Sequence, residues 1–491
     1  MKTYPTIEEV KSYASEGKYD IVPVSTEILS DFTTPIETIR ILKNISSHAY
    51  MLESAKADET WGQYTFLGFD PITDVNCVKG EMKITTNGVT RTEKTDNPSA
   101  VLREIMSGYK SPKVAGLPPF TGGFVGYFSY DYLFYSEPKA KTEAKDTEDF
   151  KDVDLMLFDK VIAFDNIRQK IVLIVNMHLS DIDENYNKAV WELKNLANLI
   201  KNGEKKNEPA GRLLGDVTPL FNKEEFCGMV EKARHHIKEG DIFQIVISNR
   251  LSAPFEGSLL NTYRMLRTIN PSPYMFYFAG TDVEVAGASP ETLVKLEDGV
   301  LHTFPLAGTR PRGKTKEEDE ALEAELLADE KELAEHNMLV DLGRNDLGKI
   351  SRFGTVEVEK LHSIERFSHV MHIGSTVRGE IREDKDAFDA IEAVLPAGTL
   401  SGAPKIRACQ LIGELEDNKR GIYGGAIGYI DFTGNMDTCI AIRIAYKKND
   451  KVFVRSGAGI VYDSVPEKEF EECLNKAKAS LKALEAAEGV E

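Results

Sequence analysis

The sequence predicts an α+β fold in which mixed, largely antiparallel sheets pack as a sandwich with flanking helices. Strand-like segments and long amphipathic helices are interspersed without the strict alternation of a doubly wound parallel sheet. The segment 424–461 shows strand alternation broken by the turn sequences TGN and KKNDK, which is typical of an antiparallel meander. The segments 160–166 and 170–179 add two further strands, and no internal repeat interrupts the chain.

Composition limits the class of protein. The chain has 491 residues, of which 28% are charged, an ordinary balance for a soluble enzyme. Its net charge of −19 argues against nucleic acid or an anionic membrane as partner. The start MKTYPTIEEV has no apolar signal segment and no apolar run of membrane-spanning length follows, so we expect a cytoplasmic protein. Without C-x-x-C spacing, the cysteines are expected to be reduced and buried: Cys77, Cys227, Cys409, Cys439 and Cys473.

A polar stretch rich in Gly and Pro suggests one domain boundary. It covers 201–217 and follows a helix rich in Asn and Lys. We therefore predict an N-terminal domain at 1–215 and a C-terminal domain at 216–491. The acidic, Lys-rich stretch 136–154 is predicted to be an exposed loop.

The meander contains a candidate anion site. Ile440, Ile442 and Ile444 alternate and are predicted to share a buried strand face. Arg443 then points to the opposite face among small residues, where a carboxylate has room for bidentate binding. Judged from this strand alone, an exposed surface arginine is the more ordinary interpretation. The glycines of the next strand, in SGAGIVYDS, let the backbone approach a ligand or form a plain bulge.

A second candidate is the loop PLAGTRPRG, 305–313. Arg310 and Arg312 flank a rigid Pro311 and can present fixed positive charge to an acid. Ala307, at the mouth of this loop, is chemically inert.

Two helices carry paired glutamates. Thr315 and Glu318 form a capping pattern that opens a helix with Glu332 and Glu335 near its end. Its apolar stripe is Leu322, Leu326 and Leu333. Most acidic residues of this helix are simply solvated, and a three-residue spacing only places the pair on one face.

The last helix repeats this arrangement. Ser464 and Glu467 are predicted to cap it, and Glu469 and Glu472 again lie three residues apart. Its core stripe is Phe470, Leu474, Leu481 and Leu484. Glutamate pairs that converge from two helices can hold a hard cation through oxygen, although either pair alone is weak evidence.

Six fragments in this order resemble the chorismate-utilising enzymes: PLAGTRPRG (305–313), EHNMLVDLGRNDLG (335–348), SHVMHIGSTVRG (368–379), GTLSGAPKIRA (398–408), YGGAIGY (423–429) and SGAGIVYDSVPEKEFEE (456–472). The resemblance is dense over 220–481 and thinner over 50–70 and 117–135. It is greatest to the large subunits that aminate chorismate to anthranilate.

The resemblance implies a complete site for chorismate, a dicarboxylate. Mg²⁺ on Glu335 and Glu472, supported by Glu332 and Glu469, is expected to take the ring carboxylate. The resemblance assigns the enolpyruvyl carboxylate and the ring to Gly308, Thr309, Thr399, Tyr423, Arg443, Gly457, Ala458, Gly459 and Lys476.

Three of the implied residues are catalytic. Glu291, in GASPETL, resembles the general acid that protonates the departing C4 hydroxyl. His372 resembles the histidine linked to the later elimination. The resemblance assigns Thr309 both a catalytic role and a role in substrate binding. For a lone histidine, a satisfied core or strand residue is otherwise the more ordinary interpretation.

The resemblance also suggests which nucleophile is used. Members that form aminodeoxychorismate have a nucleophilic lysine at the Ala307 position, and members that add water have a lysine base where Gln244 stands. With neither lysine present, ammonia is the expected nucleophile. None of the cysteines lies in a glutaminase-like elbow, so a separate glutamine amidotransferase subunit is implied, in a heterotetramer.

A regulatory site is also implied. MLES (51–54) and NPSPYMFYF (270–278) resemble a tryptophan feedback pocket with Ser54, Pro273, Tyr274 and Met275 as contacts. By composition alone, the second segment is a buried strand after a proline turn. Two alternative functions remain open: an aminodeoxychorismate or aminodeoxyisochorismate synthase component, and a non-catalytic tryptophan-binding homologue.

Overall fold

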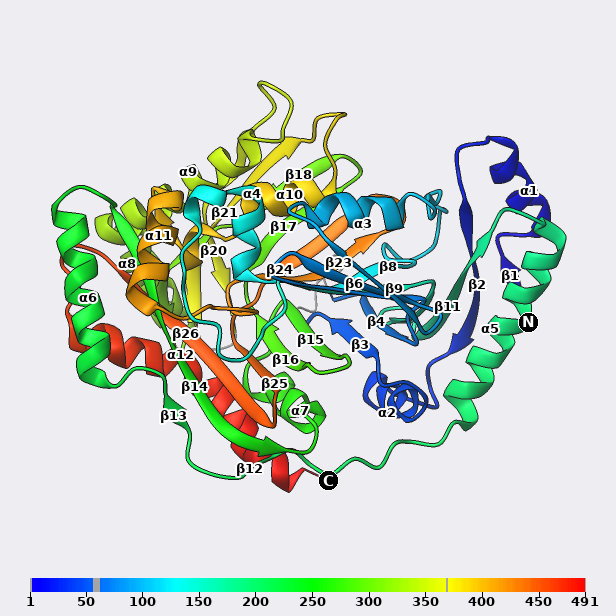
Figure 1. The fold of residues 1–491 in the computed structure, drawn as a ribbon, viewed down its shortest axis with the longest axis horizontal. Coiled ribbons are helices and arrows are strands. Elements are labelled where there is room, and N and C mark those ends of the chain that lie inside the picture. Colours follow the sequence, from blue (N-terminus) through cyan, green and yellow to red (C-terminus); the bar gives the residue numbers. More distant parts are fainter. Residues whose placement is uncertain (1, 56–61, 368–369, 491) are drawn as a thin grey trace.

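Two large antiparallel sheets pack face to face in the computed structural model, which describes residues 2–55, 62–367 and 370–490 (Figure 1). Within these residues the first sheet follows the order β1 (Thr3–Tyr4), β2 (Ile21–Leu29), β11 (Lys170–His178), β10 (Lys160–Asp165), β4 (Tyr64–Phe69), β3 (Ala49–Glu53), β15 (Tyr274–Ala279), β16 (Glu284–Ser289), β25 (Ile444–Lys448), β26 (Lys451–Ile460), β14 (Gln244–Glu256) and β12 (Arg212–Leu213). Two short strands, β13 (Thr218–Pro219) and β22 (Gly402–Ala403), also pair with β14.

The second sheet begins beside the candidate site. Its order is β19 (Leu306–Pro311), β21 (Val370–Glu380), β18 (Val300–Thr303), β17 (Thr292–Glu297), β24 (Met436–Ile440), β23 (Ala426–Asp431), β8 (Gly123–Phe128), β9 (Val153–Phe158), β5 (Thr73–Val78), β6 (Glu81–Thr86) and β7 (Val89–Lys94). A further strand, β20 (Glu357–Arg366), pairs with β21.

Helices cover the outer faces of both sheets (Figure 1). They are α1 (Ile7–Ser15), α2 (Pro35–Ile45), α3 (Pro98–Met106), α4 (Leu133–Ser136), α5 (Ile182–Asn202), α6 (Lys223–Lys238), α7 (Leu260–Ile269), α8 (Lys316–Ala328), α9 (Glu330–Gly348), α10 (Ala387–Val394), α11 (Lys405–Glu416) and α12 (Pro466–Ala486). None of the described helices is both long and apolar enough to cross a membrane.

The core lies in layers because strand side chains alternate. On β15, Phe276 and Phe278 pack between the two sheets, whereas Met275 and Tyr277 pack on the other face against the helices. The layer between the sheets also takes Tyr127 and other side chains from the second sheet. The predicted α+β sandwich with flanking helices is confirmed.

Each sheet contains strands from both sides of residue 215. In the first sheet, β3 pairs with β15, with Phe276 opposite Leu52. In the second sheet, β8 pairs with β23, with Val125 opposite Tyr429. The two predicted domains thus share both sheets, and the division at residue 215 stays a prediction. The stretch 203–211, between α5 and β12, is irregular backbone.

The single meander predicted over 424–461 is wrong. The segment forms two hairpins in different sheets: β23–β24 in the second sheet and β25–β26 in the first. The chain crosses between the sheets at 441–443, where Arg443 takes a left-handed conformation with φ 55°. The shared face predicted for Ile440, Ile442 and Ile444 does not form, because β24 ends at Ile440 and β25 begins at Ile444.

The helix starts also differ from expectation. Thr315 caps α8 as predicted, accepting from the Glu318 N–H at 3.2 Å, but α8 ends at Ala328 and a second cap, Asp329, opens α9. The Leu322, Leu326 and Leu333 stripe still packs together, across the break. Ser464 does not cap α12, which begins at Pro466 after Val465, because proline at the first position fixes the start of a helix.

Loop and cysteine expectations are largely met. All five cysteines are free thiols, and only Cys227 is not fully buried. The predicted loop before β9 is irregular over most of its length, but Phe150 and Lys151 are buried rather than exposed.

Candidate active site

The crossing at 441–443 opens the edge of one strand. Because β25 pairs with β26 only from Tyr446–Phe453 to Lys448–Lys451, the Gly457–Gly459 stretch of β26 has β14 as a neighbour but not β25. In an antiparallel strand, alternate residues direct their N–H and C=O groups to opposite sides. Part of this backbone is therefore directed toward the gap beside Arg443.

Two side chains approach these glycines closely. A Cβ atom on Gly457 would lie 3.1 Å from the Tyr423 hydroxyl, and one on Gly459 would lie 3.1 Å from Gln244 Nε2. Larger residues would push these side chains away, so the glycines are required by close approach.

Arg443 is the cationic group of this gap. Its side chain is half-buried, and in the described part of the chain its guanidinium forms no ion pair. Burial lowers the pKa of Arg443, and the nearby Tyr423 opposes that shift. A half-buried guanidinium without a carboxylate partner is suited to bind an anion in bidentate geometry.

Glu291 supplies a buried acid. It lies between β16 and β17 and is 8% exposed. Burial raises its pKa to about 8, although hydrogen bonds from Thr399 and the Leu306 N–H oppose the shift. The Thr399 hydroxyl donates to Glu291 Oε1 at 3.3 Å. The carboxyl is therefore protonated at neutral pH and can act as a general acid. Glu291, Thr399 and Ile440 line a cavity of about 30 Å³, which we call the Glu291 cavity.

His372 faces Thr309 across the β19–β21 pair. Its Nδ1 lies 3.0 Å from the Gly308 carbonyl oxygen and 3.1 Å from the Thr309 hydroxyl. A carbonyl only accepts, so Nδ1 carries the hydrogen and Nε2 keeps its lone pair. Burial lowers the pKa of His372, so the ring is neutral near pH 7 and Nε2 can accept a proton. Gly308 has φ 70° at a bulge in β19, which glycine adopts without strain.

The glutamate pairs come from α9 and α12. The pKa of Glu335 is raised by burial and, less strongly, by Glu332 and Glu472. The pKa of Glu469 is raised by burial and by Glu472. The two pairs thus lie within electrostatic reach of each other, but no three His, Cys, Asp or Glu side chains of the described residues converge closely enough to hold a metal ion.

The chemistry of this cluster fits a hard cation. All its donors are carboxylate oxygens, which Mg²⁺ prefers, and Glu335 has no ion pair within the described residues. Glu472 is paired with Lys476 at 2.7 Å. Lys476 also donates to the Gly457 carbonyl at 3.1 Å, so it connects the carboxylates to β26.

The loop arginines do not face an open anion site. Arg310 contacts Glu325, Asp329 and Glu332. Arg312 binds Asp319 at 2.9 Å. The acids to which they present their charge belong to the chain itself, and these pairs hold β19 against α8 and α9.

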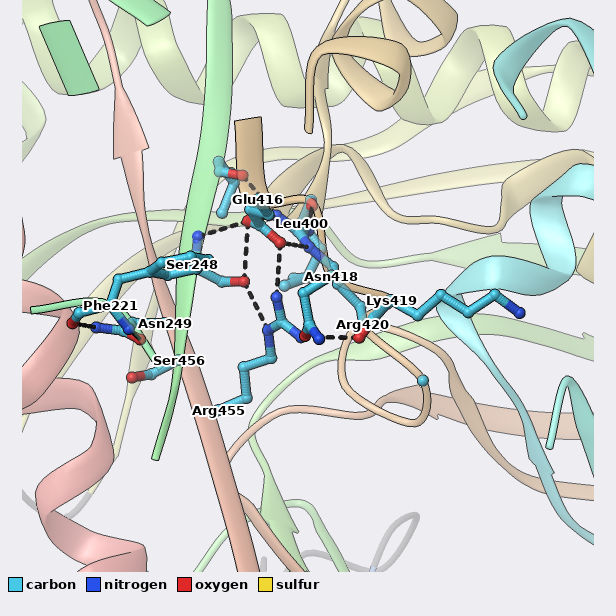
Figure 2. Close-up of polar contacts among 12 residues, drawn as sticks. Phe221, Ser248, Asn249, Leu400, Glu416, Asn418, Lys419, Arg420, Arg455 and Ser456 are labelled. Atoms are coloured by element: carbon cyan, nitrogen blue, oxygen red, sulfur yellow. Dashed lines mark hydrogen bonds and ion pairs between the residues drawn. The ribbon is translucent and has the colours of Figure 1, made fainter. Parts of the chain in front are cut away.

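A buried ion cluster supports β14 and β26 (Figure 2). Glu416 accepts hydrogen bonds from Arg420 at 2.6 Å and from Arg455 at 2.7 Å. Ser248 lies opposite Gly457 in the strand pair and also donates to Glu416, at 3.0 Å. These contacts fix the strand edge that carries the glycines. Glu416 and Arg420 lie four residues apart, but Ser248 and Arg455 come from distant strands, so no short motif indicates the whole cluster.

The Ser54 and Pro273–Met275 segments are brought together. Met275 pairs with Glu53 across β15 and β3, and the Ala55 N–H donates to the Ser272 carbonyl at 3.0 Å. They border a cavity of about 170 Å³ between the two sheets, which we call the inter-sheet pocket. Its other polar lining residues include Glu53, Lys295, Glu297, Asn435 and Asp437. Sequence reasoning missed the last four because they come from the opposite sheet.

The first two residues of SHVMHIGSTVRG, Ser368 and His369, lie outside the described residues, as does the segment 56–61. The predicted site residues are all described. Glu291, Thr309, His372 and Arg443 surround one region together with Lys476, whose charge acts on the pKa of both Glu291 and His372.

Arg443 lacks a carboxylate partner within the described residues, and Glu291 is an acid whose pKa is raised by burial; Lys476 and His372 connect the two electrostatically. Such a combination is typical of an enzyme that binds an anionic small molecule and donates a proton to it. The family model of the chorismate binding enzymes matches residues 7–482. The chain is 47% identical to anthranilate synthase component 1 of Acetivibrio thermocellus over 99% of both chains. It is 44% identical to that of Aquifex aeolicus over 98% of both chains.

Solved structures agree. Anthranilate synthase component I from Streptococcus pneumoniae superposes with a TM-score of 0.75 at 37% identity, covering 92% of this chain and 98% of that one. The menaquinone-specific isochorismate synthase MenF from Escherichia coli has a TM-score of 0.71 at 20% identity over 97% and 98% of the two chains, a likeness of fold alone. The chain belongs to the chorismate binding enzymes, among the relatives of anthranilate synthase component 1.

Proposed function

We propose that this chain is the chorismate-binding large subunit of an anthranilate synthase, which converts chorismate and ammonia to anthranilate and pyruvate. The observation that supports this most strongly is Glu291, a carboxyl that burial holds protonated up to about pH 8 within the same site as Arg443. The description of the family supplies chorismate as the ligand, and the names of the relatives matched over nearly their full length supply anthranilate as the product.

The first step replaces the C4 hydroxyl of chorismate. Glu291 protonates that hydroxyl, which leaves as water, while ammonia forms a C–N bond at C2 and the ring double bonds shift. Arg443, Tyr423 and the Gly457–Gly459 backbone hold the enolpyruvyl carboxylate during this step. The intermediate is an aminodeoxyisochorismate.

The second step releases pyruvate. His372 Nε2 accepts the proton from C2 as the C3–O bond breaks, and the departing enolpyruvate takes up a proton from water to become pyruvate. Aromatisation of the ring makes this step strongly favourable. Mg²⁺, held by Glu335 and Glu472 with Glu332 and Glu469 nearby, would neutralise the ring carboxylate and orient it.

Two positions support ammonia as the nucleophile. Ala307 has no group that can attack the ring, and Gln244 lacks the basicity needed to activate water. The Gln244 side chain is buried, and its Oε1 has no hydrogen-bond partner within the described residues. Ammonia is itself nucleophilic and needs neither group.

The remaining parts of the proposal concern partners and regulation. A glutamine amidotransferase subunit would supply ammonia, in a heterotetramer, and tryptophan would bind the inter-sheet pocket as feedback inhibitor. The component 1 naming of the relatives supports a second component. The free cysteines and the net charge of −19 are consistent with a cytoplasmic location. The N-terminal domain, 1–215, would contribute Ser54, and the C-terminal domain, 216–491, the chorismate site.

The test uses purified full-length chain with chorismate and Mg²⁺, and either ammonium chloride or glutamine as nitrogen source. Anthranilate is followed by its fluorescence and pyruvate by a coupled assay. We expect equal amounts of both products with ammonium, and none with glutamine alone. An amino product without pyruvate would indicate an aminodeoxychorismate or aminodeoxyisochorismate synthase, and no consumption of chorismate would indicate a non-catalytic homologue.

A further inference from the structure

The inter-sheet pocket and the Glu291 cavity share one wall. Tyr274, Asp437 and Cys439 line the pocket, whereas Thr292 and Ile440 line the Glu291 cavity. Thr292 lies opposite Cys439 in the β17–β24 pair. A single pair of strands therefore separates the two cavities, and Thr292 is the residue directly after Glu291.

A hydrogen-bond chain crosses this wall. The Tyr274 hydroxyl donates to Asp437 Oδ1 at 2.8 Å and lies 2.9 Å from the Thr292 hydroxyl oxygen. Since the single phenol hydrogen is directed to Asp437, Thr292 is the donor in the second bond. The Thr292 side chain is thereby held by a group of the inter-sheet pocket.

Other hydrogen bonds also hold the main chain around Glu291, including one from the Glu291 N–H to the Ser289 hydroxyl at 3.4 Å. The Glu291 carbonyl accepts from the Ile440 N–H at 3.0 Å, and the Ser289 hydroxyl donates to the Ile440 carbonyl at 2.7 Å. The register of β17 against β24 then shifts between Thr292 and Val294. An irregularity of this kind interrupts the ladder and re-aims neighbouring side chains. The hydrogen bond between the Thr292 and Tyr274 side chains lies at that interruption of the ladder.

We propose that Thr292 is a positioning residue: its hydrogen bond to Tyr274 fixes the main chain that carries Glu291, whose carboxyl is also bound by Thr399 at 3.3 Å, and a molecule bound in the inter-sheet pocket acts on catalysis by displacing the Thr292–Tyr274 bond. The regulatory half rests on the proposed function, in which that molecule is tryptophan. A ligand can shift the site only through a different affinity for its two arrangements, and the Tyr274 hydroxyl bond gives it such a difference.

The test compares three variants with the wild type. Thr292→Val removes the hydroxyl at nearly constant shape, and Thr292→Ser retains it. The matched control is Thr438→Val: Thr438 is a buried threonine of the adjacent strand β24, and among the described residues its hydroxyl donates to the Val294 carbonyl alone, at 2.8 Å. For each protein, tryptophan affinity is measured by calorimetry with and without chorismate and Mg²⁺, and kcat and KM are measured without tryptophan.

In the wild type, chorismate should weaken tryptophan binding by roughly 5- to 150-fold, the usual range of allosteric coupling. In Thr292→Val that factor should fall below about twofold, while tryptophan still binds the enzyme alone and kcat decreases more than KM changes. Thr292→Ser and Thr438→Val should behave like the wild type. Unchanged coupling and kcat in Thr292→Val, or an equal loss in Thr438→Val, would overturn the proposal.

Failure of the proposed function has a different signature. If the wild type binds no tryptophan, the inter-sheet pocket is not a tryptophan site. The positioning role is then judged by kcat alone: a decrease in Thr292→Val that Thr292→Ser restores supports it, and an unchanged kcat contradicts it.

Discussion

Two buried acids in this molecule have opposite protonation states. Glu416 and Glu291 are both removed from water, yet only Glu416 is in contact with guanidinium groups. Burial alone would raise the pKa of Glu416, but Arg420 and Arg455 outweigh it and lower that pKa. Burial raises the pKa of Glu291 to about 8, because no cation within the described residues pairs with it.

The arginines show the same contrast. Arg455 is fully buried and bonded to Glu416, Ser248 and Asn418. Arg443 is half-buried and has no ion pair in the described part of the protein. Paired buried charges are a scaffold, because each satisfies the other. Buried groups left without a partner mark where substrate and protons are handled.

The largest expected effect is on catalysis. Glu291→Gln keeps the size of the side chain but cannot donate a proton to the leaving hydroxyl, so kcat/KM should fall by about 10²- to 10⁴-fold. Steady-state anthranilate formation measures this, and calorimetry should show chorismate binding retained. An activity loss explained entirely by lost binding would remove Glu291 from the role of acid.

The same substitution should not destabilise the fold. An unfolded Glu291 loses its proton near its ordinary pKa, whereas the folded one keeps it to about pH 8, so this residue makes folding less favourable as pH rises through that window. Glu291→Gln should therefore melt at or above the wild-type temperature at pH 8.

The opposite result is expected for the paired acid. Glu416→Gln leaves two buried guanidinium groups short of a counter-charge, and breaking a buried pair costs about 3–5 kcal/mol. Urea unfolding should show this loss of unfolding free energy, while the folded fraction keeps its KM for chorismate. A stable Glu416→Gln protein with no activity would make Glu416 part of the chemistry instead.

An intermediate effect is expected at the carboxylate pairs. Glu335→Gln removes one anionic oxygen, and the Mg²⁺ concentration for half-maximal activity should rise on the order of 100-fold, at the upper end of the range seen when only supporting residues are lost. Magnesium titration of the rate measures this. Glu325→Gln is the control, since Glu325 contacts Arg310 on an exposed face. Equal Mg²⁺ requirements in both variants would contradict the assignment.

A smaller effect is expected at Arg443. Arg443→Lys keeps the charge but loses the planar fork, and a lost charged hydrogen bond costs about 1.5–3 kcal/mol, so KM for chorismate should rise about 10- to 100-fold. Arg103→Lys is a matched control, because Arg103 forms a two-point contact with Asp386 outside this site. An unchanged KM in Arg443→Lys would place the carboxylate elsewhere.

Sequence reasoning reached the fold class because alternation, turns and helix stripes are local signals. It failed at 441–443, because three alternating isoleucines resemble one continuous strand. No sequence pattern indicates that the backbone of Arg443 takes a left-handed conformation. It also failed wherever an observation needed two distant segments. The contact between Tyr274 and Asp437 joins residues of the two different sheets, which no local pattern indicates.

The resemblance supplied the site residues, and the structure supplied their environments. Burial of Glu291 and the protonated Nδ1 of His372 depend on packing that no short motif records. The physical reason is that pKa values follow desolvation and neighbouring charge, both of which are properties of the folded chain.

The pH dependence of kcat/KM for chorismate, measured at a constant concentration of free ammonia, tests most directly whether Glu291 acts as a buried, protonated acid. Holding free ammonia constant removes the effect of pH on the nucleophile. The account predicts a plateau at neutral pH and a one-proton decline centred near pH 8, which disappears from the residual activity of Glu291→Gln. A profile that is flat through pH 9, or the same decline in Glu291→Gln, would contradict it.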